Sequence, residues 1–263
     1  MTDHPTQDNN VLLTPNERID SINFNIRLIQ NKQGLTFGTD AFLLSAFVRP
    51  SVRARAVDLG SGTGIIPLLL LAKSKVKTVT AVEVQESFAE LIARNAAING
   101  MTDRLFPMQA DVRSLSAAAL GFEADLVVSN PPYMRCDTGR RNQHDEKYIA
   151  RHEVMGGIFD FCSAAGRLLK HGGRFVCVFR PDRLTDLFSA MREAMLEPKR
   201  MTLVYADADS EPSSVLIEAV KGAAPSLRTT PPLLLYRPRC ETNKTRVLTP
   251  VAQKIYDDCQ FPY

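Results

Sequence analysis

The fold is decided by the stretch Ala56-Val57-Asp58-Leu59-Gly60-Ser61-Gly62-Thr63-Gly64. Its first four residues predict a buried strand, and the apolar residues from Ile65 to about Lys73 predict a helix. The glycines between them allow a tight turn and let the backbone approach a ligand closely. The dinucleotide-binding fingerprint needs a further glycine at its sixth place, where this chain has Ile65. The stretch therefore predicts a ligand-binding α/β protein of another type.

Downstream of the turn, short apolar strands alternate with helical segments. Strands are expected at 78–84, 105–110, 125–129, 175–179, 201–205 and 215–220, with helices at 87–99, 159–169 (stopped by Gly172-Gly173) and 184–195. This alternation predicts mostly parallel strands with helices on both faces of a sheet. The last two strands have no long helix between them, so we expect them to pair as an antiparallel edge.

The segment before the turn has a different pattern. Residues up to about Asp20 are polar and are expected to form a tail. Alternation of Ile22, Phe24, Ile26 and Leu28 with polar residues predicts a strand. The turn-forming residues 31–34, followed by an extended segment at 35–37, predict that this strand belongs to a β-hairpin. A short helix is expected over 41–47, with Asp40 as its N-cap.

Composition excludes several classes of protein. The 263 residues are 44% hydrophobic and 23% charged, which is typical of a folded globular protein. The longest apolar run, Ile65–Ala72, is far shorter than the roughly 18 residues of a membrane span. Five scattered cysteines without a CxxC pair favour neither zinc nor disulfides, so a cytoplasmic protein without a metal is expected. The net charge of +3 is a weak sign of a polyanionic partner.

Acidic residues lie at the ends of the first predicted parallel strands. Asp58 lies within the first, Glu83 ends the second roughly 20 residues after the turn, and Asp111 follows the third. An acid at the position of Glu83 is well placed to accept hydrogen bonds from ribose hydroxyls. Ligands of open α/β sheets gather at the carboxyl ends of the strands, so these acids predict a nucleoside-binding site there.

The strand at 125–129 continues directly into Asn130-Pro131-Pro132-Tyr133. A planar exocyclic amine is a poor nucleophile because its lone pair is delocalised. The Asn130 side-chain oxygen and the Pro131 carbonyl can accept both N–H groups, and prolines hold the carbonyl in a set direction. Tyr133 offers a ring for stacking a flipped-out base. The tetrad predicts catalysis by orientation and electrostatics rather than by a general base.

The glycine turn resembles motif I of class I S-adenosylmethionine (SAM)-dependent methyltransferases. With the tetrad, most of the chain, from about Leu12 to Asp257, resembles the NPPY-type N-methyltransferases, and within them the bacterial tRNA1(Val) adenine-37 N6-methyltransferases. The likeness includes Phe37–Leu44 before the turn, Ala150–Glu153 after the tetrad, and the tail residues Leu235-Tyr236, Thr249 and Ile255-Tyr256. The tail departs from the family pattern by its extra basic residues Arg237, Arg239, Lys244 and Arg246.

The resemblance implies a fold, a cofactor and a set of binding residues. The implied fold is Rossmann-like, with a seven-stranded, mostly parallel sheet that has an antiparallel edge and an N-terminal hairpin extension. SAM would be bound by Thr39 and Asp40 over its methionine end, by Asp111 at its adenine amine, and by the remaining cofactor residues Asp58, Gly60, Gly62, Gly64, Glu83 and Asn130.

Substrate binding is expected in the short segments around the core. The implied partner is tRNA. The basic segment after the tetrad supplies the candidate phosphate-binding residues Arg135, Arg140 and Arg141, and the resemblance adds Arg151 and His152. The expected division is an N-terminal arm, hairpin and helix (1–50), a SAM-binding domain (51–222) and a basic tail packing on the core (223–263).

Three alternative functions remain open. The same tetrad could methylate the amide N5 of a protein glutamine on a release factor, although such enzymes usually carry a helical N-terminal domain for which this chain has no space. Methylation of a small molecule, or of a guanine N2 in ribosomal RNA, is a second alternative. A SAM-fold RNA-binding module without activity is a third, and the intact tetrad argues against it.

Overall fold

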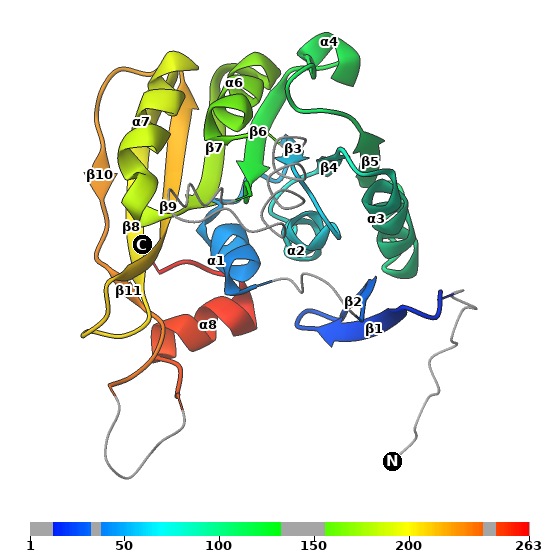
Figure 1. Ribbon diagram of the computed structural model, residues 1–263, viewed down its shortest axis with the longest axis horizontal. Helices are drawn as coiled ribbons and strands as arrows, with labels where there is room; N and C mark the ends of the chain where they lie inside the picture. The colour runs from blue at the N-terminus through cyan, green and yellow to red at the C-terminus, as the bar shows by residue number, and fades with distance from the viewer. Residues whose placement is uncertain (1–12, 33–37, 133–155, 239–245, 263) are drawn as a thin grey trace, which may run out of the picture.

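A nine-stranded sheet forms the centre of the molecule (Figure 1). The computed structural model describes residues 13–32, 38–132, 156–238 and 246–262. Strands follow one another across the sheet in the order β10-β8-β9-β7-β6-β3-β4-β5, and β11 also pairs with β8. The strands are β3 (Arg55–Leu59), β4 (Thr78–Glu83), β5 (Leu105–Gln109), β6 (Ala124–Ser129), β7 (Leu169–Phe179), β8 (Leu196–Tyr205), β9 (Pro212–Lys221), β10 (Arg228–Thr229) and β11 (Leu233–Leu234).

The predicted mostly parallel sheet is confirmed. Strands β5, β4, β3, β6 and β7 run parallel to one another, whereas β9 runs antiparallel to both β7 and β8. The last two long strands therefore pair as predicted, and the reversed strand β9 lies inside the sheet. Short strands β10 and β11, which the sequence did not predict, add to the outer side of β8.

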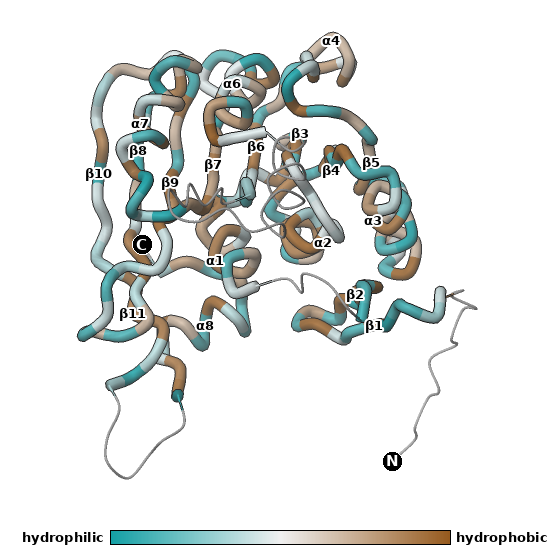
Figure 2. Tube along the Cα trace, viewed as in Figure 1, coloured by the Kyte–Doolittle hydropathy of each residue, from teal (hydrophilic) through white to brown (hydrophobic). Residues whose placement is uncertain are grey.

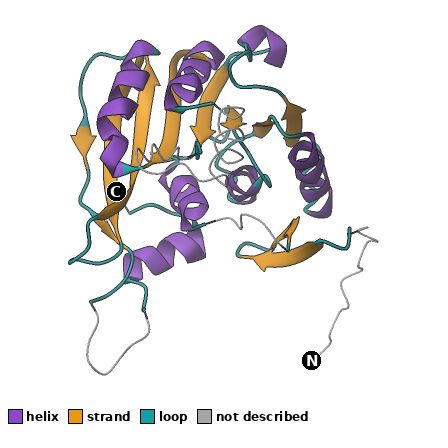
Figure 3. Ribbon diagram, viewed as in Figure 1, coloured by secondary structure: helices purple, strands orange, loops and turns teal. Residues whose placement is uncertain are grey.

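Helices cover both faces of the sheet (Figure 3). The helices are α1 (Thr39–Phe47), α2 (Ile65–Ala72), α3 (Glu86–Ile98), α4 (Ala117–Leu120), α6 (Ile158–Leu168), α7 (Leu184–Glu193) and α8 (Pro250–Asp258), with a 3₁₀ turn at Pro181–Arg183. One apolar core joins the sheet to α1, α2 and α8, and a second joins it to α6 and α7. Alternate residues of β3 enter different cores, Ala56 the first and Val57 the second. Helix α2 is the most uniformly apolar of these helices (Figure 2), because nearly all of it is buried.

An N-terminal hairpin is present, but its turn does not lie at the predicted residues 31–34, and the second strand expected at 35–37 lies outside the described residues. Its strands are β1 (Glu17–Ile22) and β2 (Ile26–Asn31), so residues 17–20, expected as a tail, form a strand. The chain turns at Asn23–Asn25, where Phe24 and Asn25 have positive φ angles of 70° and 58°. Ile22 and Ile26 are cross-strand partners, so their side chains face the same side of the hairpin. Residues four apart in one continuous strand would also share a face, and the sequence pattern is therefore the same in both cases.

Two predicted helix ends need correction, and helices α4 and α8 were not predicted. Gly38, rather than Asp40, is the N-cap of α1, and Asp40 lies in its first turn. Helix α6 agrees with the range predicted for it, but the glycines at 172 and 173 do not end it, because β7 begins directly at Leu169 and includes both. Helix α8 was not predicted; Thr249 caps it by accepting a hydrogen bond from the Ala252 N–H.

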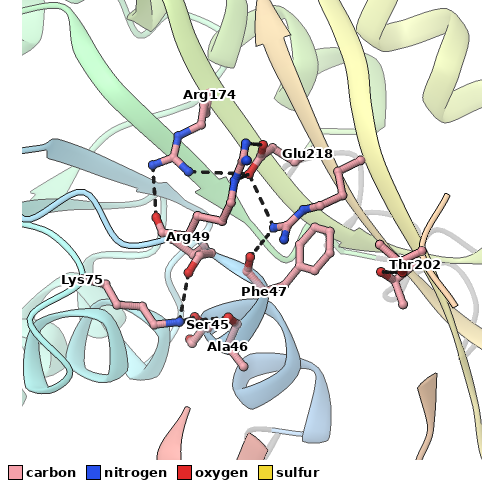
Figure 4. A network of polar contacts seen from close by, with 11 residues as sticks. Ser45, Ala46, Phe47, Arg49, Lys75, Arg174, Thr202 and Glu218 are labelled. Carbon is pink, nitrogen blue, oxygen red and sulfur yellow. Dashed lines mark hydrogen bonds and ion pairs between the residues drawn. The ribbon is translucent and has the colours of Figure 1, made fainter. Parts of the chain in front are cut away.

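The C-terminal end of α1 is held by a buried polar network (Figure 4). The Lys75 ammonium donates to the carbonyls of Ser45, Ala46 and Val48 at 2.6, 2.9 and 2.9 Å. Burial lowers the pKa of Lys75 to about 8. The network therefore anchors α1, whose first turn contains Thr39 and Asp40.

The second half of the network centres on Glu218, a fully buried carboxylate of β9. It is paired with Arg49, Arg174 and Arg200 (Figure 4). The Arg200 guanidinium also donates to the Phe47 carbonyl and lies 3.8 Å from the centre of the Phe47 ring. These contacts join α1 to β9 across the sheet face.

Candidate cofactor and catalytic site

Three predicted site segments meet at the carboxyl edge of the sheet. Leu59 at the end of β3 is level with Val82 of β4 and with Ser129 of β6. The chain passes from β3 to β4 on one side and later returns to β6 on the other. This reversal of strand order is the place where α/β sheets bind ligands. The glycine turn, Glu83 and Asn130 therefore lie together at the carboxyl edge of the sheet, where the strand order reverses.

The glycine turn is fixed to β4 by its own backbone. The N–H groups of Gly60 and Ser61 both donate to the Val82 carbonyl at 3.0 Å. The N–H of Gly62 donates to Glu83 Oε2 at 3.0 Å. Glu83 Oε1 accepts from the Gln85 N–H at 3.0 Å, and the side chain is buried. The carboxylate thus shapes the turn and keeps further lone pairs for a ligand.

The glycines of the turn have positive φ angles, and each has its own surroundings. A Cβ on Gly60 would lie 3.2 Å from the Phe161 ring, and one on Gly64 would lie 3.2 Å from Ile92. A Cβ on Gly62 would meet no atom of the described residues within 4 Å. Close packing thus explains two glycines, and open space beside the third allows a ligand to reach the backbone.

Asp58, at the end of β3, is hydrogen-bonded to the glycine turn. Its side chain is 1% exposed and accepts a hydrogen bond from the Ser61 hydroxyl. Burial and the charge of Glu83 together raise the pKa of Asp58 to about 7, against the opposing effect of the Ser61 hydrogen bond. This carboxyl therefore gains or loses its proton near neutral pH.

Asp111 lies two residues beyond β5, at the same edge of the sheet. It is partly exposed and accepts hydrogen bonds from the Arg113 side chain through both oxygens, and from the Arg113 N–H at 2.8 Å. These contacts lower the pKa of Asp111 below its usual range. The carboxylate therefore stays ionised at neutral pH.

The tetrad begins at the end of β6. Ser129 Oγ donates to the Leu59 carbonyl at 2.9 Å, which ties the end of β6 to the start of the glycine turn. Asn130 and Pro132 are half-buried and Pro131 is buried. The predicted residues Tyr133, Arg135, Arg140, Arg141, Arg151 and His152 lie outside the described residues.

Thr39 and Asp40 lie in the first turn of α1 and are half-buried. Tyr256 of α8 is hydrogen-bonded to Thr39, and its ring is 5.2 Å from that of Phe42. Burial raises the pKa of Tyr256, and the Thr39 hydrogen bond opposes this effect. The unpredicted helix α8 therefore supports the segment that the sequence assigned to the cofactor.

Sequence reasoning missed several residues that support the turn. Ser61 binds Asp58 from within the turn, the Phe161 ring packs beside Gly60, and Asn95 donates a hydrogen bond to the Thr63 carbonyl. Phe161 and Asn95 are distant from the turn in sequence, and only the packing of α6 and α3 brings them to it. One signal was available, because Asn95 and Asn99 are four residues apart and thus share a helix face.

Among the described residues, no group of histidine, cysteine or acidic side chains has the arrangement of a metal site. No helix in the described ranges is both long and apolar enough to span a membrane.

The fold and the site together define a methyltransferase. The family model "Methyltransferase small domain" matches residues 31–199, and the chain belongs to this family. A Porphyromonas gingivalis protein named tRNA1(Val) (adenine(37)-N6)-methyltransferase is 30% identical over 187 residues, 69% of this chain and 72% of that protein.

Solved structures share the fold. A protein from Agrobacterium tumefaciens described as a predicted O-methyltransferase has a TM-score of 0.66 at 20% identity, covering 84% of this chain and 97% of that one. Geranyl diphosphate C-methyltransferase from Streptomyces coelicolor, solved with S-adenosyl-L-homocysteine, has a TM-score of 0.50 at 16% identity, covering 68% and 77%. The cofactor of this class is SAM.

Proposed function

We propose that this protein is a SAM-dependent methyltransferase that modifies N6 of an adenine in tRNA, at a position of the tRNA1(Val) adenine-37 type. One observation carries the proposal: pairing of β3 with β6 sets the glycine turn beside Asn130-Pro131-Pro132. A methyl donor in the turn and an amine held by Asn130 would then be neighbours. The name of the P. gingivalis relative supports tRNA adenine as the acceptor.

The residues present fit SAM. Open space beside the Gly62 backbone allows close approach, with Gly60 and Gly64 giving the turn its shape. Glu83 is proposed to accept hydrogen bonds from the ribose hydroxyls, and Asp111 to accept one from the adenine amine. Thr39 and Asp40 are assigned to the methionine end, and Asp58 to holding the turn through Ser61. When bound, SAM supplies a methyl group on a positively charged sulfur.

Catalysis is assigned to the amine-binding groups. The Asn130 side-chain oxygen and the Pro131 carbonyl accept the two N–H groups of the adenine amine, which localises its lone pair. Pro131 and Pro132 restrict φ and keep the carbonyl direction fixed. A bound SAM would supply the methyl carbon that the nitrogen attacks and the sulfur leaving group, and the extra proton of the amine would leave to water. Tyr133 is proposed to stack on the flipped base.

Substrate recognition is assigned to the segments outside the sheet. Arg135, Arg140, Arg141, Arg151 and His152 are proposed to contact RNA phosphates. The division into 1–50, 51–222 and 223–263 is likewise a proposal, in which the first and last segments flank the SAM-binding domain. RNA would be recognised by shape, phosphates and a splayed base rather than by groove readout.

The deciding assay incubates the purified protein with labelled SAM and total tRNA, followed by digestion to nucleosides. N6-methyladenosine is the expected product. Asn130→Ala should lower kcat by at least about 100-fold. Calorimetric binding of S-adenosylhomocysteine should stay within about twofold, because Asn130 is proposed to act chiefly on the amine and the other residues assigned to the cofactor are unchanged.

The same assay separates the alternatives. Label on a release-factor glutamine, with none on tRNA, would contradict the acceptor class, as would labelled guanine from ribosomal RNA. Full activity in the Asn130→Ala protein would contradict the catalytic role. Binding of S-adenosylhomocysteine without transfer to any acceptor would favour an RNA-binding module.

A further inference from the structure

A single buried amide connects the N-terminal hairpin to the glycine turn. Asn95 of α3 is 0% exposed. Its Oδ1 accepts from the Ile29 N–H at 2.7 Å, and its Nδ2 donates to the Ile29 carbonyl at 3.1 Å and to the Thr63 carbonyl at 2.9 Å. Both N–H groups of the amide are therefore used, one on the hairpin and one on the turn.

The hairpin orients this amide. The outer edge of β2 meets α3, where Asn99 repeats the pattern one helical turn later: it accepts from the Arg27 N–H at 2.9 Å and donates to the Arg27 carbonyl at 2.7 Å. The two asparagine side chains thus pair with backbone N–H and carbonyl groups on the outer edge of β2, as a neighbouring strand would. Arg94 adds a two-fold ion pair to Glu17 of β1 at 2.7 and 2.8 Å.

The contact on the turn is placed where it affects backbone direction. Thr63 lies between Gly62 and Gly64, both of which have positive φ angles. Fixing the Thr63 carbonyl fixes the peptide plane that leads into Gly64 and α2. Glycine loses more conformational freedom than any other residue on ordering, so an external hydrogen bond matters most at such a turn.

We propose that Asn95 is a positioning residue for the cofactor turn, and that through it the hairpin is part of the cofactor-binding unit. The inference rests on the proposed function, because it takes the turn to be the SAM site. Two bonds from Ile29 set the amide plane, and the remaining N–H then aims at Thr63. Asn99 has the same contacts to the hairpin, but its other N–H group donates to the Asn95 backbone carbonyl at 2.7 Å instead of to the turn, and it serves as the control.

The test compares Asn95→Asp with Asn99→Asp. Each aspartate keeps an acceptor and loses two N–H donors. We expect Asn95→Asp to weaken binding of S-adenosylhomocysteine about tenfold, measured by calorimetry. Asn99→Asp should change it by no more than about twofold, although both variants lower the Tm. Equal effects on affinity, or none, would overturn the inference.

A measurement on the unmodified protein covers the case in which Asn95→Asp does not fold. Coupling is reciprocal, so a ligand on the turn should slow hydrogen exchange of the hairpin amide that Asn95 holds. Adding S-adenosylhomocysteine should protect the Ile29 N–H several-fold more than the Arg27 N–H. Equal protection of both amides would contradict the proposal.

Failure of the proposed function looks different. Absence of S-adenosylhomocysteine binding by the unmodified protein would refute the cofactor assignment, and the inference with it. An unchanged affinity in Asn95→Asp would refute only the role of Asn95. A protein or guanine acceptor in place of tRNA adenine would leave the Asn95 result unaffected.

Discussion

Asp58 illustrates how burial at one residue makes a binding loop sensitive to pH. Its carboxyl is enclosed under the glycine turn, near the charge of Glu83, with the Ser61 hydroxyl as its hydrogen-bond donor. The folded-state pKa of about 7 lies above the ordinary value of 3.8. Between these values the folded protein keeps a proton that the unfolded chain releases. Raising the pH through this window therefore destabilises the fold.

Replacing Asp58 tests this sign. Asp58→Asn should remove a slope that approaches about 1.4 kcal/mol of unfolding free energy per pH unit. As the pH rises from about 5 to 7, the unfolding free energy of Asp58→Asn should therefore increase relative to that of the wild type. Urea unfolding at several pH values measures it. The exposed control Asp103→Asn should follow the wild type, and a parallel Asp58→Asn curve would refute the assigned pKa.

At the scale of elements, α1 shows how one helix obtains its C-terminal cap from elsewhere. It has no basic residue in its own last turn. Lys75, from the segment between α2 and β4, supplies the charge and three hydrogen bonds to its terminal carbonyls. The cap is therefore a tertiary contact.

Removing this cap should weaken α1. Lys75→Met keeps most of the side-chain volume but leaves buried carbonyls without a donor, which should lower the unfolding free energy by about 2–4 kcal/mol. Lys77→Met, at an exposed position nearby, should change it by less than about 0.5 kcal/mol. Chemical denaturation measures both. Similar values for the two variants would show that Lys75 is dispensable.

At the scale of the whole molecule, α8 connects the chain ends to the site. The Tyr256 carbonyl accepts from the Asn23 side chain in the hairpin turn at 2.7 Å, while its ring packs on Phe42 of α1. Phe261 packs edge-on against Phe47 with ring centres 5.0 Å apart. One short helix thus joins the hairpin turn to α1.

The docking of α8 can be tested at its buried face. Ile255→Ala leaves a cavity against the core and should lower the unfolding free energy by about 2–5 kcal/mol. Lys254→Ala, on the exposed side of the same helix, should have an effect below about 0.5 kcal/mol. Thermal and chemical unfolding distinguish them. An Ile255→Ala protein as stable as the control would mean that α8 contributes little to the core.

Strands and helices with a strong local sequence pattern were predicted correctly, whereas the short hairpin and the short helix α8 were not. The predicted parallel strands and α2, α3, α6 and α7 all appear, because periodic apolar residues and glycines act locally. The hairpin turn was predicted at the wrong residues, since Ile22 and Ile26 face one side whether the chain continues or turns between them. Helix α8 was missed because it is short and has only two buried residues, Ala252 and Ile255, which are too few to form an apolar pattern.

The sequence by itself determined the glycine turn, the acids at successive strand ends and the Asn130 tetrad, because each follows directly from neighbouring residues in a strand-turn-helix unit. Tertiary structure alone decided that Asn95 reaches Thr63, that Lys75 caps α1 and that Tyr256 supports Thr39. Hydrogen-bonding groups of the backbone accept partners from any part of the chain. Which side chain supplies the partner depends on how helices and hairpin pack, and a local pattern carries no record of that packing.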